Sequence, residues 1–194
     1  STVSIGIYEL TSENLAVKKY RNGDQIPEAT TLAAWQAFNT SQQGCFSYYN
    51  NYLGNDVSYG VLYNKWAVLD SRELAPIGHR IPTLTEWNGI VSAAGTNAAT
   101  EMKSENFWSS GAGNNLTGAD IRPNGYRLAL AANNDFAGLL TESRIWAADG
   151  VSYVKYSTSN AIDTTGTGAL NDGYAVRLLK NSNYNGWNGD PDYL

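Results

Sequence analysis

The sequence predicts an α+β domain with two short helices in its first half and many short strands in its second half. Two segments carry helical patterns of apolar residues. From residue 104 onward, short apolar runs alternate with Gly- and Asn-rich stretches, a pattern typical of strands joined by long loops. The length of 194 residues suits one domain. A chain of this size buries roughly 70% of its unfolded surface and needs no disulfide to fold.

The first strand and the first helix are predicted from local patterns. Apolar and polar residues partly alternate over Val3–Leu10, which predicts a strand. Thr31–Phe38 contains helix-forming residues and therefore predicts a short helix. Its apolar face consists of Leu32, Trp35 and Phe38.

The second helix has a defined start and stop. Thr83 and Glu86 have the spacing of a capping box, in which each side chain bonds the backbone N–H of the other residue. Pro82 directly precedes the box, and Gly95 supplies a left-handed stop. The apolar face of this helix consists of Leu84, Trp87, Ile90 and Val91.

The second half is predicted to form short strands, followed by a tail of different composition. The predicted strands lie at Ile121, Tyr126–Leu128, Phe136, Ile145–Trp146, Ser152–Tyr156 and Tyr174–Leu179. Residues 181–194 are rich in Asn, Gly and aromatic side chains and show no period. We therefore divide the chain into a domain over residues 1–180 and a tail over 181–194. The tail aromatics Tyr184, Trp187 and Tyr193 are interface candidates, for self-association or for packing on the domain's own flank.

Composition narrows the class of partner. The formal net charge is −5 and no Lys/Arg cluster exists, so we expect no nucleic-acid partner. No apolar run approaches ~18 residues, so we expect no membrane insertion. Only 16% of residues are charged, while the chain has six Trp and thirteen Tyr. Tyr and Trp give rigid contact area and Asn and Ser give adaptable polar contacts, a mixture typical of recognition surfaces.

The residues for catalysis or metal binding are sparse, so we expect no enzymatic activity, no cofactor and no metal. Cys45 is the only cysteine, which excludes an intrachain disulfide, and His79 is the only histidine. A zinc site needs three or four such ligands. The glutamates form no recognisable hydrolase motif, and Glu86 is already assigned as a helix cap. Asn133–Asp135 and Asn188–Asp192 could offer oxygen ligands to calcium, but turn formation explains both.

An ordered set of motifs resembles one family. In chain order they are Glu13-Asn14-Leu15, Tyr20-Arg21-Asn22-Gly23-Asp24, Ile26-Pro27, Cys45-Phe46, Tyr59-Gly60, Trp66-Ala67-Val68, Arg80-Ile81-Pro82-Thr83, Glu86-Trp87, Gly125-Tyr126-Arg127 and Gly173-Tyr174-Ala175-Val176-Arg177. Over about residues 9–180 this set resembles the Fibrobacter succinogenes major paralogous domain, a branch of the C-type lectin-like fold. The sequence departs from the family pattern at Gly78-His79-Arg80 and at Trp146-Ala147-Ala148. The ligand contacts of the family therefore do not transfer directly to this chain.

The resemblance implies an architecture and a function. We expect a C-type lectin-like fold, with two short helices flanking twisted antiparallel sheets and long ligand-facing loops after the second helix. Relatives occur in bacterial surface proteins and in phage tail adhesins, where the C-terminal region carries the binding residues. The candidate ligand contacts are therefore Tyr153, Lys155, Tyr156, Asn160, Asp163, Asn171 and Asp172.

These observations predict a non-catalytic adhesin that binds a bacterial-surface glycan or protein. An exposed domain without disulfides favours a phage virion protein that folds in the bacterial cytoplasm, acting as a tail fibre or receptor-binding protein. Its weak contacts call for several copies, as a homo-oligomer or with other virion proteins. Two alternatives stay open: a structural virion protein for decoration or fibre assembly, and a bacterial cell-envelope module that binds polysaccharide.

Overall fold

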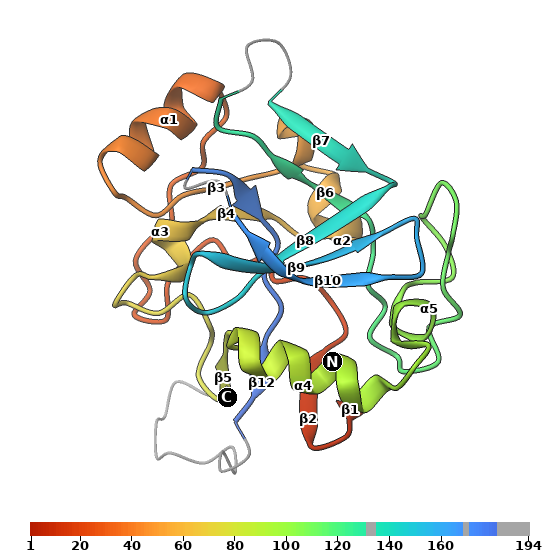
Figure 1. Ribbon diagram of the computed structural model, residues 1–194. Helices are drawn as coiled ribbons and strands as arrows, with labels where there is room; N and C mark the ends of the chain where they lie inside the picture. Colours follow the sequence, from red (N-terminus) through yellow and green to blue (C-terminus); the bar gives the residue numbers. More distant parts are fainter. Residues whose placement is uncertain (131–134, 169–170, 182–194) are drawn as a thin grey trace.

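The computed structural model describes residues 1–130, 135–168 and 171–181, which form a mixed α and β structure with two sheets (Figure 1). The smaller sheet contains, in order, β1 (Thr2–Ile5), β2 (Tyr8–Thr11), β12 (Leu179–Lys180) and β5 (His79–Arg80). The larger sheet contains, in order, β10 (Ile162–Thr167), β9 (Ser152–Ser157), β8 (Glu142–Trp146), β6 (Asn124–Arg127), β11 (Gly173–Tyr174), β4 (Leu62–Asn64) and β3 (Phe46–Ser47). A further strand, β7 (Phe136–Leu139), pairs with β6.

The first predicted strand is a hairpin, so the prediction of one strand over Val3–Leu10 was wrong. The chain reverses at Gly6, which has a φ of +59°, and the Ile7 side chain beside it is 92% exposed. Glycine adopts this left-handed backbone without the steric cost that a Cβ would bring. Apolar and polar residues alternate across the turn, and for this reason the pattern looks continuous.

The larger sheet is mixed, which corrects the expectation of antiparallel sheets only. β6 and β8 pair in parallel through Gly125 and Ser143. The intervening β7 runs antiparallel to β6, and β8 reverses direction again, so β8 runs the same way as β6. The predicted strand over Tyr174–Leu179 is also divided, because β11 lies in the larger sheet and β12 in the smaller one. Residues 175–178 are buried where the chain passes between the two sheets.

Both predicted helices are confirmed. α1 (Leu32–Thr40) begins at Thr31, whose hydroxyl accepts from the Ala34 backbone N–H. α4 (Leu84–Ala94) begins with the capping box of Thr83 and Glu86. In Figure 1 the two helices lie at opposite ends of the molecule, α1 beside the larger sheet and α4 beside β1, β2 and β12. The sequence did not predict the short helices α2 (Asn55–Tyr59), α3 (Lys65–Val68), α5 (Ala98–Met102) and η1 (Tyr49–Asn51).

Two main apolar clusters fill the interior, and they lie on the two faces of β8 and β9. One cluster joins Trp87 and Ile90 of α4 to Val154 and Tyr156 of β9. The other joins residues that include Tyr63, Trp146, Tyr174 and Val176. Burying one large apolar side chain stabilises the fold by about 1.5–3 kcal/mol. The larger sheet is thus packed on both sides, and its outer face carries half-exposed side chains on β6, β8, β9 and β10.

Candidate recognition surface

The candidate surface is the outer face of β8, β9 and β10. Side chains alternate between the two faces of a strand. Val154 and Tyr156 therefore face the core, while Tyr153 and Lys155 face outward and are partly exposed. Lys155 pairs with Asp163 of β10 in the strand register.

Arg144 of β8 is the centre of an aromatic cluster on this face. Its guanidinium carbon lies 3.6 Å from the ring centroid of Tyr126, 5.3 Å from that of Tyr153 and 5.7 Å from that of Tyr174. Cation–π attraction operates within about 6 Å of a ring centroid. We call these four residues the Arg144 cluster. Tyr126 and Tyr153 keep part of their side chains accessible, whereas Tyr174 is fully buried beneath them.

Glu142 holds the Arg144 guanidinium in place. The Glu142 Oε1 accepts from the Arg144 Nε at 2.9 Å, and both side chains are less than one-fifth exposed. Burial acts to lower the pKa of Arg144, but the hydrogen bond and charge of Glu142 raise the pKa by more. The guanidinium therefore stays protonated and keeps one orientation between the tyrosine rings.

Two glycines allow the aromatic rings to pack onto the sheet. A Cβ on Gly166 of β10 would lie 2.4 Å from the Tyr153 ring, and a Cβ on Gly168 would lie 2.8 Å from the Trp146 ring. Both distances are too short for any side chain. Trp146 is fixed further by a 2.9 Å hydrogen bond from its Nε1 to the Tyr63 carbonyl oxygen.

The remaining outward-facing candidates lie along the hairpin of β9 and β10. The Lys155 Nζ and the Asp163 Oδ2 are 4.0 Å apart, and about a third of each side chain is exposed. The Thr165 backbone N–H and hydroxyl both donate to Asp163 at 2.8 Å and, together with Lys155, lower its pKa. Asn160 is exposed in the turn between β9 and β10.

Two candidates are buried and do not belong to this surface. The Tyr156 side chain is fully buried, and its hydroxyl lies 3.4 Å from the Met102 sulfur. Asp172 is 5% exposed and accepts from the Ala129 N–H and the Tyr174 hydroxyl, each at 3.1 Å. Burial raises the pKa of Asp172. Both residues therefore support the surface from within instead of contacting a ligand.

Asn171 lies at the edge of this region, on a corner held by α1. Its side chain is exposed. Its carbonyl oxygen accepts from the Trp35 Nε1 at 2.7 Å and from the Asn39 Nδ2 at 3.3 Å. The tail candidates Tyr184, Trp187 and Tyr193 lie outside the described residues.

Sequence reasoning missed Arg144 and its partners Tyr126 and Glu142. The signal was present, because Glu142, Arg144 and Trp146 alternate with Ser143 and Ile145 along one strand. Placing them beside Tyr153 required the pairing of β8 with β9, which is a tertiary fact.

The only cysteine and the only histidine of the chain lie at different sheets. Cys45 is fully buried, and burial raises the pKa of its thiol to about 12. It precedes β3 of the larger sheet, whereas His79 lies in β5 of the smaller sheet. In the described part of the chain, no group of three or more His, Cys, Asp or Glu side chains is placed to hold a metal ion. No helix within those same residues is long and apolar enough to cross a membrane.

The fold and this surface define a mixed α and β domain that presents tyrosine rings, amides and paired charges. Residues 3–180 match the family described as the Fibrobacter succinogenes major domain. The chain belongs to this family. Neither the curated proteins nor the solved structures contain a match to the chain.

Proposed function

We propose that this protein is a non-catalytic adhesin with a C-type lectin-like fold, which binds a bacterial-surface glycan or protein through the outer face of β8–β10. The Arg144 cluster carries this proposal. Its half-exposed rings of Tyr126 and Tyr153 flank a guanidinium that Glu142 holds in place. Such a pre-ordered surface loses little entropy when a ligand binds.

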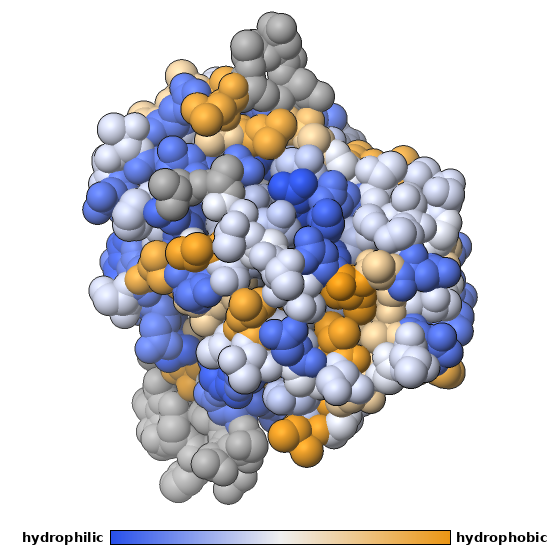
Figure 2. Space-filling view, viewed as in Figure 1, coloured by the Kyte–Doolittle hydropathy of each residue, from blue (hydrophilic) through white to orange (hydrophobic). Residues whose placement is uncertain are grey.

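The polar groups around the cluster suit a glycan. The face of a tyrosine ring packs against the C–H groups of a sugar ring, while its hydroxyl stays available for hydrogen bonds. Lys155 supplies donors and Asp163 supplies acceptors on the same face, and Asn160 adds an amide at the turn of this hairpin. The side of the molecule in Figure 2 is mainly hydrophilic, with small apolar patches scattered between polar side chains. That mixture favours a hydrated, polar ligand over a large apolar partner.

Family membership supports a place on a bacterial or phage surface. The family resemblance points to bacterial surface proteins and phage tail adhesins. Single contacts of this type are weak, but linked copies raise the overall avidity by about 10²–10⁴-fold. We therefore propose display on the virion, as a homo-oligomer or together with other virion proteins.

The test compares binding of purified variants to intact bacteria and to a glycan array. Tyr153→Ala and Lys155→Ala remove a partly exposed ring and a partly exposed donor, and each is expected to weaken binding by about 5- to 50-fold. The matched control is Tyr52→Ala, because Tyr52 is an exposed tyrosine (66%) that lies outside β8, β9 and β10. Melting curves of all variants verify that the fold is intact.

The outcomes separate the three functions. Selective loss with the β9 variants supports the adhesin. Assembly into large particles without binding to cells or glycans would instead favour a structural virion protein. Binding only to purified cell-wall polysaccharide, unchanged by Tyr153→Ala, would favour an envelope module.

A further inference from the structure

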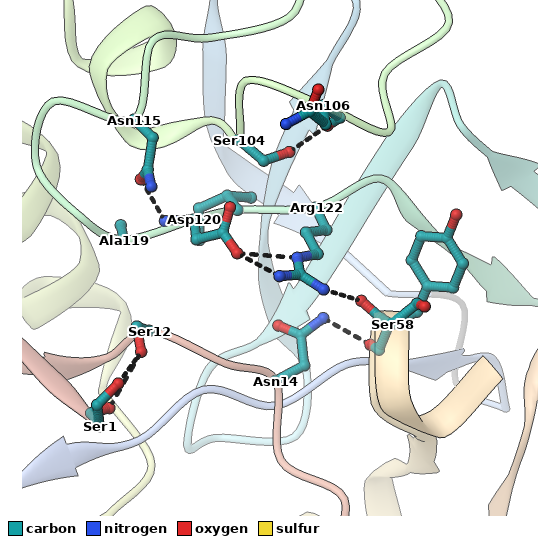
Figure 3. A network of polar contacts seen from close by, with 12 residues as sticks. Ser1, Ser12, Asn14, Ser58, Ser104, Asn106, Asn115, Ala119, Asp120 and Arg122 are labelled. Carbon is teal, nitrogen blue, oxygen red and sulfur yellow. Dashed lines mark hydrogen bonds and ion pairs between the residues drawn. The ribbon is translucent and has the colours of Figure 1, made fainter. Parts of the chain in front are cut away.

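A polar pocket of about 340 Å³ lies away from the recognition surface, between the N-terminal segment and α2. Its wall includes Ser12, Glu13, Ser58, Tyr59, Arg122 and Arg177. Figure 3 shows Arg122 between Asp120 and Ser58, with the Asn14 amide beside it. The volume falls in the range of small-molecule sites, about 300–1,000 Å³.

Arg122 is held rigidly but keeps free donors. Its Nε donates to the Asp120 Oδ2 at 2.8 Å, its Nη2 forms an ion pair with the same oxygen at 2.7 Å, and its Nη1 donates to the Ser58 carbonyl oxygen at 3.0 Å. Each terminal nitrogen carries two N–H groups. Within the described part of the chain, each of the two therefore keeps one N–H without an acceptor. A fork of this kind matches a carboxylate.

Arg177 adds a second guanidinium at the inner wall. It is 1% exposed, and its acceptors are all neutral oxygens. They are the Asn14 Oδ1 and the carbonyl oxygens of Thr11, Ala119 and Asp120, at 2.6–2.9 Å. Among the described residues, no carboxylate bonds to this buried charge. The nearby charges of Asp120 and Glu13 compensate it only in part, because burial lowers the pKa of Arg177 by more than these two carboxylates raise it. A further anion beside the guanidinium would complete the compensation.

An aromatic residue with a strained backbone, Phe107, packs against two residues of the pocket wall. The Phe107 ring lies 4.6 Å from the Arg122 guanidinium carbon and 5.9 Å from the Tyr59 ring. Phe107 has a φ of +75° and is 40% exposed. A bulky residue rarely adopts a left-handed backbone, and such strain concentrates at functional sites.

We propose that this pocket binds the carboxylate of an acidic sugar, with the Arg122 fork as the anchor and Arg177 behind it. Ser12, Ser58 and Glu13 line the same pocket and offer hydroxyl and carboxylate groups to the sugar hydroxyls. A bare anion would leave these groups unused. A neutral sugar would place no charged acceptor on the free N–H groups of Arg122 and no negative charge beside Arg177.

The test titrates the protein with glucuronate, its neutral analogue glucuronamide, and acetate, and follows backbone amide shifts by NMR. Glucuronate is expected to bind with a Kd on the order of 1 mM, at least about 10-fold tighter than either comparison ligand. The shifting amides are expected at residues 12–14, 58–60 and 122. Equal affinity for glucuronate and glucuronamide, equal affinity for acetate, or no saturable shift would each overturn the proposal.

The location of the shifts separates this proposal from the adhesin. Shifts confined to β8–β10 would overturn the pocket and support the recognition surface. Shifts confined to the pocket leave the adhesin to be decided by the Tyr153 variant.

Variants test the role of the Arg122 charge. Arg122→Gln is expected to reduce the ratio of the affinities for glucuronate and glucuronamide toward one, and Arg122→Lys is expected to retain most of this ratio.

The matched control is Arg72→Gln. Arg72 also bonds the aspartate two residues earlier and stacks on a ring, that of Tyr20 at 4.1 Å, but it lies outside this pocket. An unchanged preference in Arg122→Gln would contradict the proposed anchor. If that variant fails to fold, the comparison of ligands on the wild-type chain still decides.

Discussion

At the scale of single residues, buried cations bonded to carbonyl oxygens are a recurring device in this fold. Lys103, Arg127 and Arg177 are all buried. Lys103 donates to three carbonyl oxygens, and Arg127 donates to the carbonyl of Ala29 and faces Asp135 at 3.5 Å. A buried cation with neutral acceptors avoids the cost of desolvating a second charge. Because the acceptors lie in other parts of the chain, each of these side chains joins segments that are distant in the sequence.

Lys103→Met tests this device. The substitution keeps the length of the side chain and its packing near Trp108, but it leaves the carbonyl groups of Gly111, Ser157 and Ser159 without their donor. We expect the free energy of unfolding to fall by about 2–3 kcal/mol, because unsatisfied acceptors lose their hydrogen bonds. Urea denaturation measures this loss. Lys155→Met in β9 is the control and should change the free energy by less than about 0.5 kcal/mol. If Lys103→Met lowers the free energy of unfolding no more than the control does, water molecules accept the role of the lost donor and bond to the three carbonyl oxygens.

At the scale of elements, local signals predicted the helices, and long-range pairing decided the strands. The caps of α1 and α4 lie within four residues of their helices, so the sequence alone placed them. The position of Tyr156 was predictable in principle, because Lys155 must face outward and its neighbour must then face inward. The error arose because β9 carries a tyrosine on each face. The strand β10 was missed because Gly166 and three threonines give it no apolar period.

The capping box of α4 gives a pH-dependent prediction. Burial acts to raise the pKa of Glu86, but hydrogen bonds from Arg80 and Thr83 lower it by more, so the pKa lies below its ordinary value. The folded state then binds fewer protons than the unfolded state, and the stabilisation is lost as the pH falls through the folded pKa. We expect Glu86→Gln to reduce the free energy of unfolding by about 1 kcal/mol at neutral pH. Below both pKa values this difference should shrink.

Urea denaturation at neutral and acidic pH measures the effect of Glu86→Gln. Glu105→Gln is a suitable control, because Glu105 is exposed and lies outside any helix. A difference between wild type and Glu86→Gln that stays constant with pH would mean that packing, and not the carboxylate charge, stabilises the start of α4.

At the scale of the whole molecule, the two ends of the domain are joined in one sheet. β2 lies between β1 and β12, and Leu10 pairs with Leu179. The Thr11 N–H donates to the Leu178 carbonyl oxygen, and the Leu178 N–H donates to the Thr11 hydroxyl. No local pattern could predict a pairing between residues so far apart in the chain. Contacts between residues so far apart also carry the entropy cost of closing the long intervening loop, which precedes any stabilisation from the pairing.

Removal of residues 1–11 tests whether this closure is essential. The deletion removes β1, β2 and the fully buried Leu10, and it leaves β12 with β5 as its only partner in the smaller sheet. It also removes the Thr11 carbonyl that accepts from Arg177. We expect cooperative thermal unfolding, followed by circular dichroism, to be lost, because a buried leucine alone contributes about 2–5 kcal/mol to a domain stable by about 5–15 kcal/mol. Ile7→Ser, at the exposed tip of the same hairpin, should leave the transition within a few degrees of wild type. A truncated chain that still unfolds cooperatively would mean that the larger sheet and α4 form an independent folding unit, with the hairpin added to it.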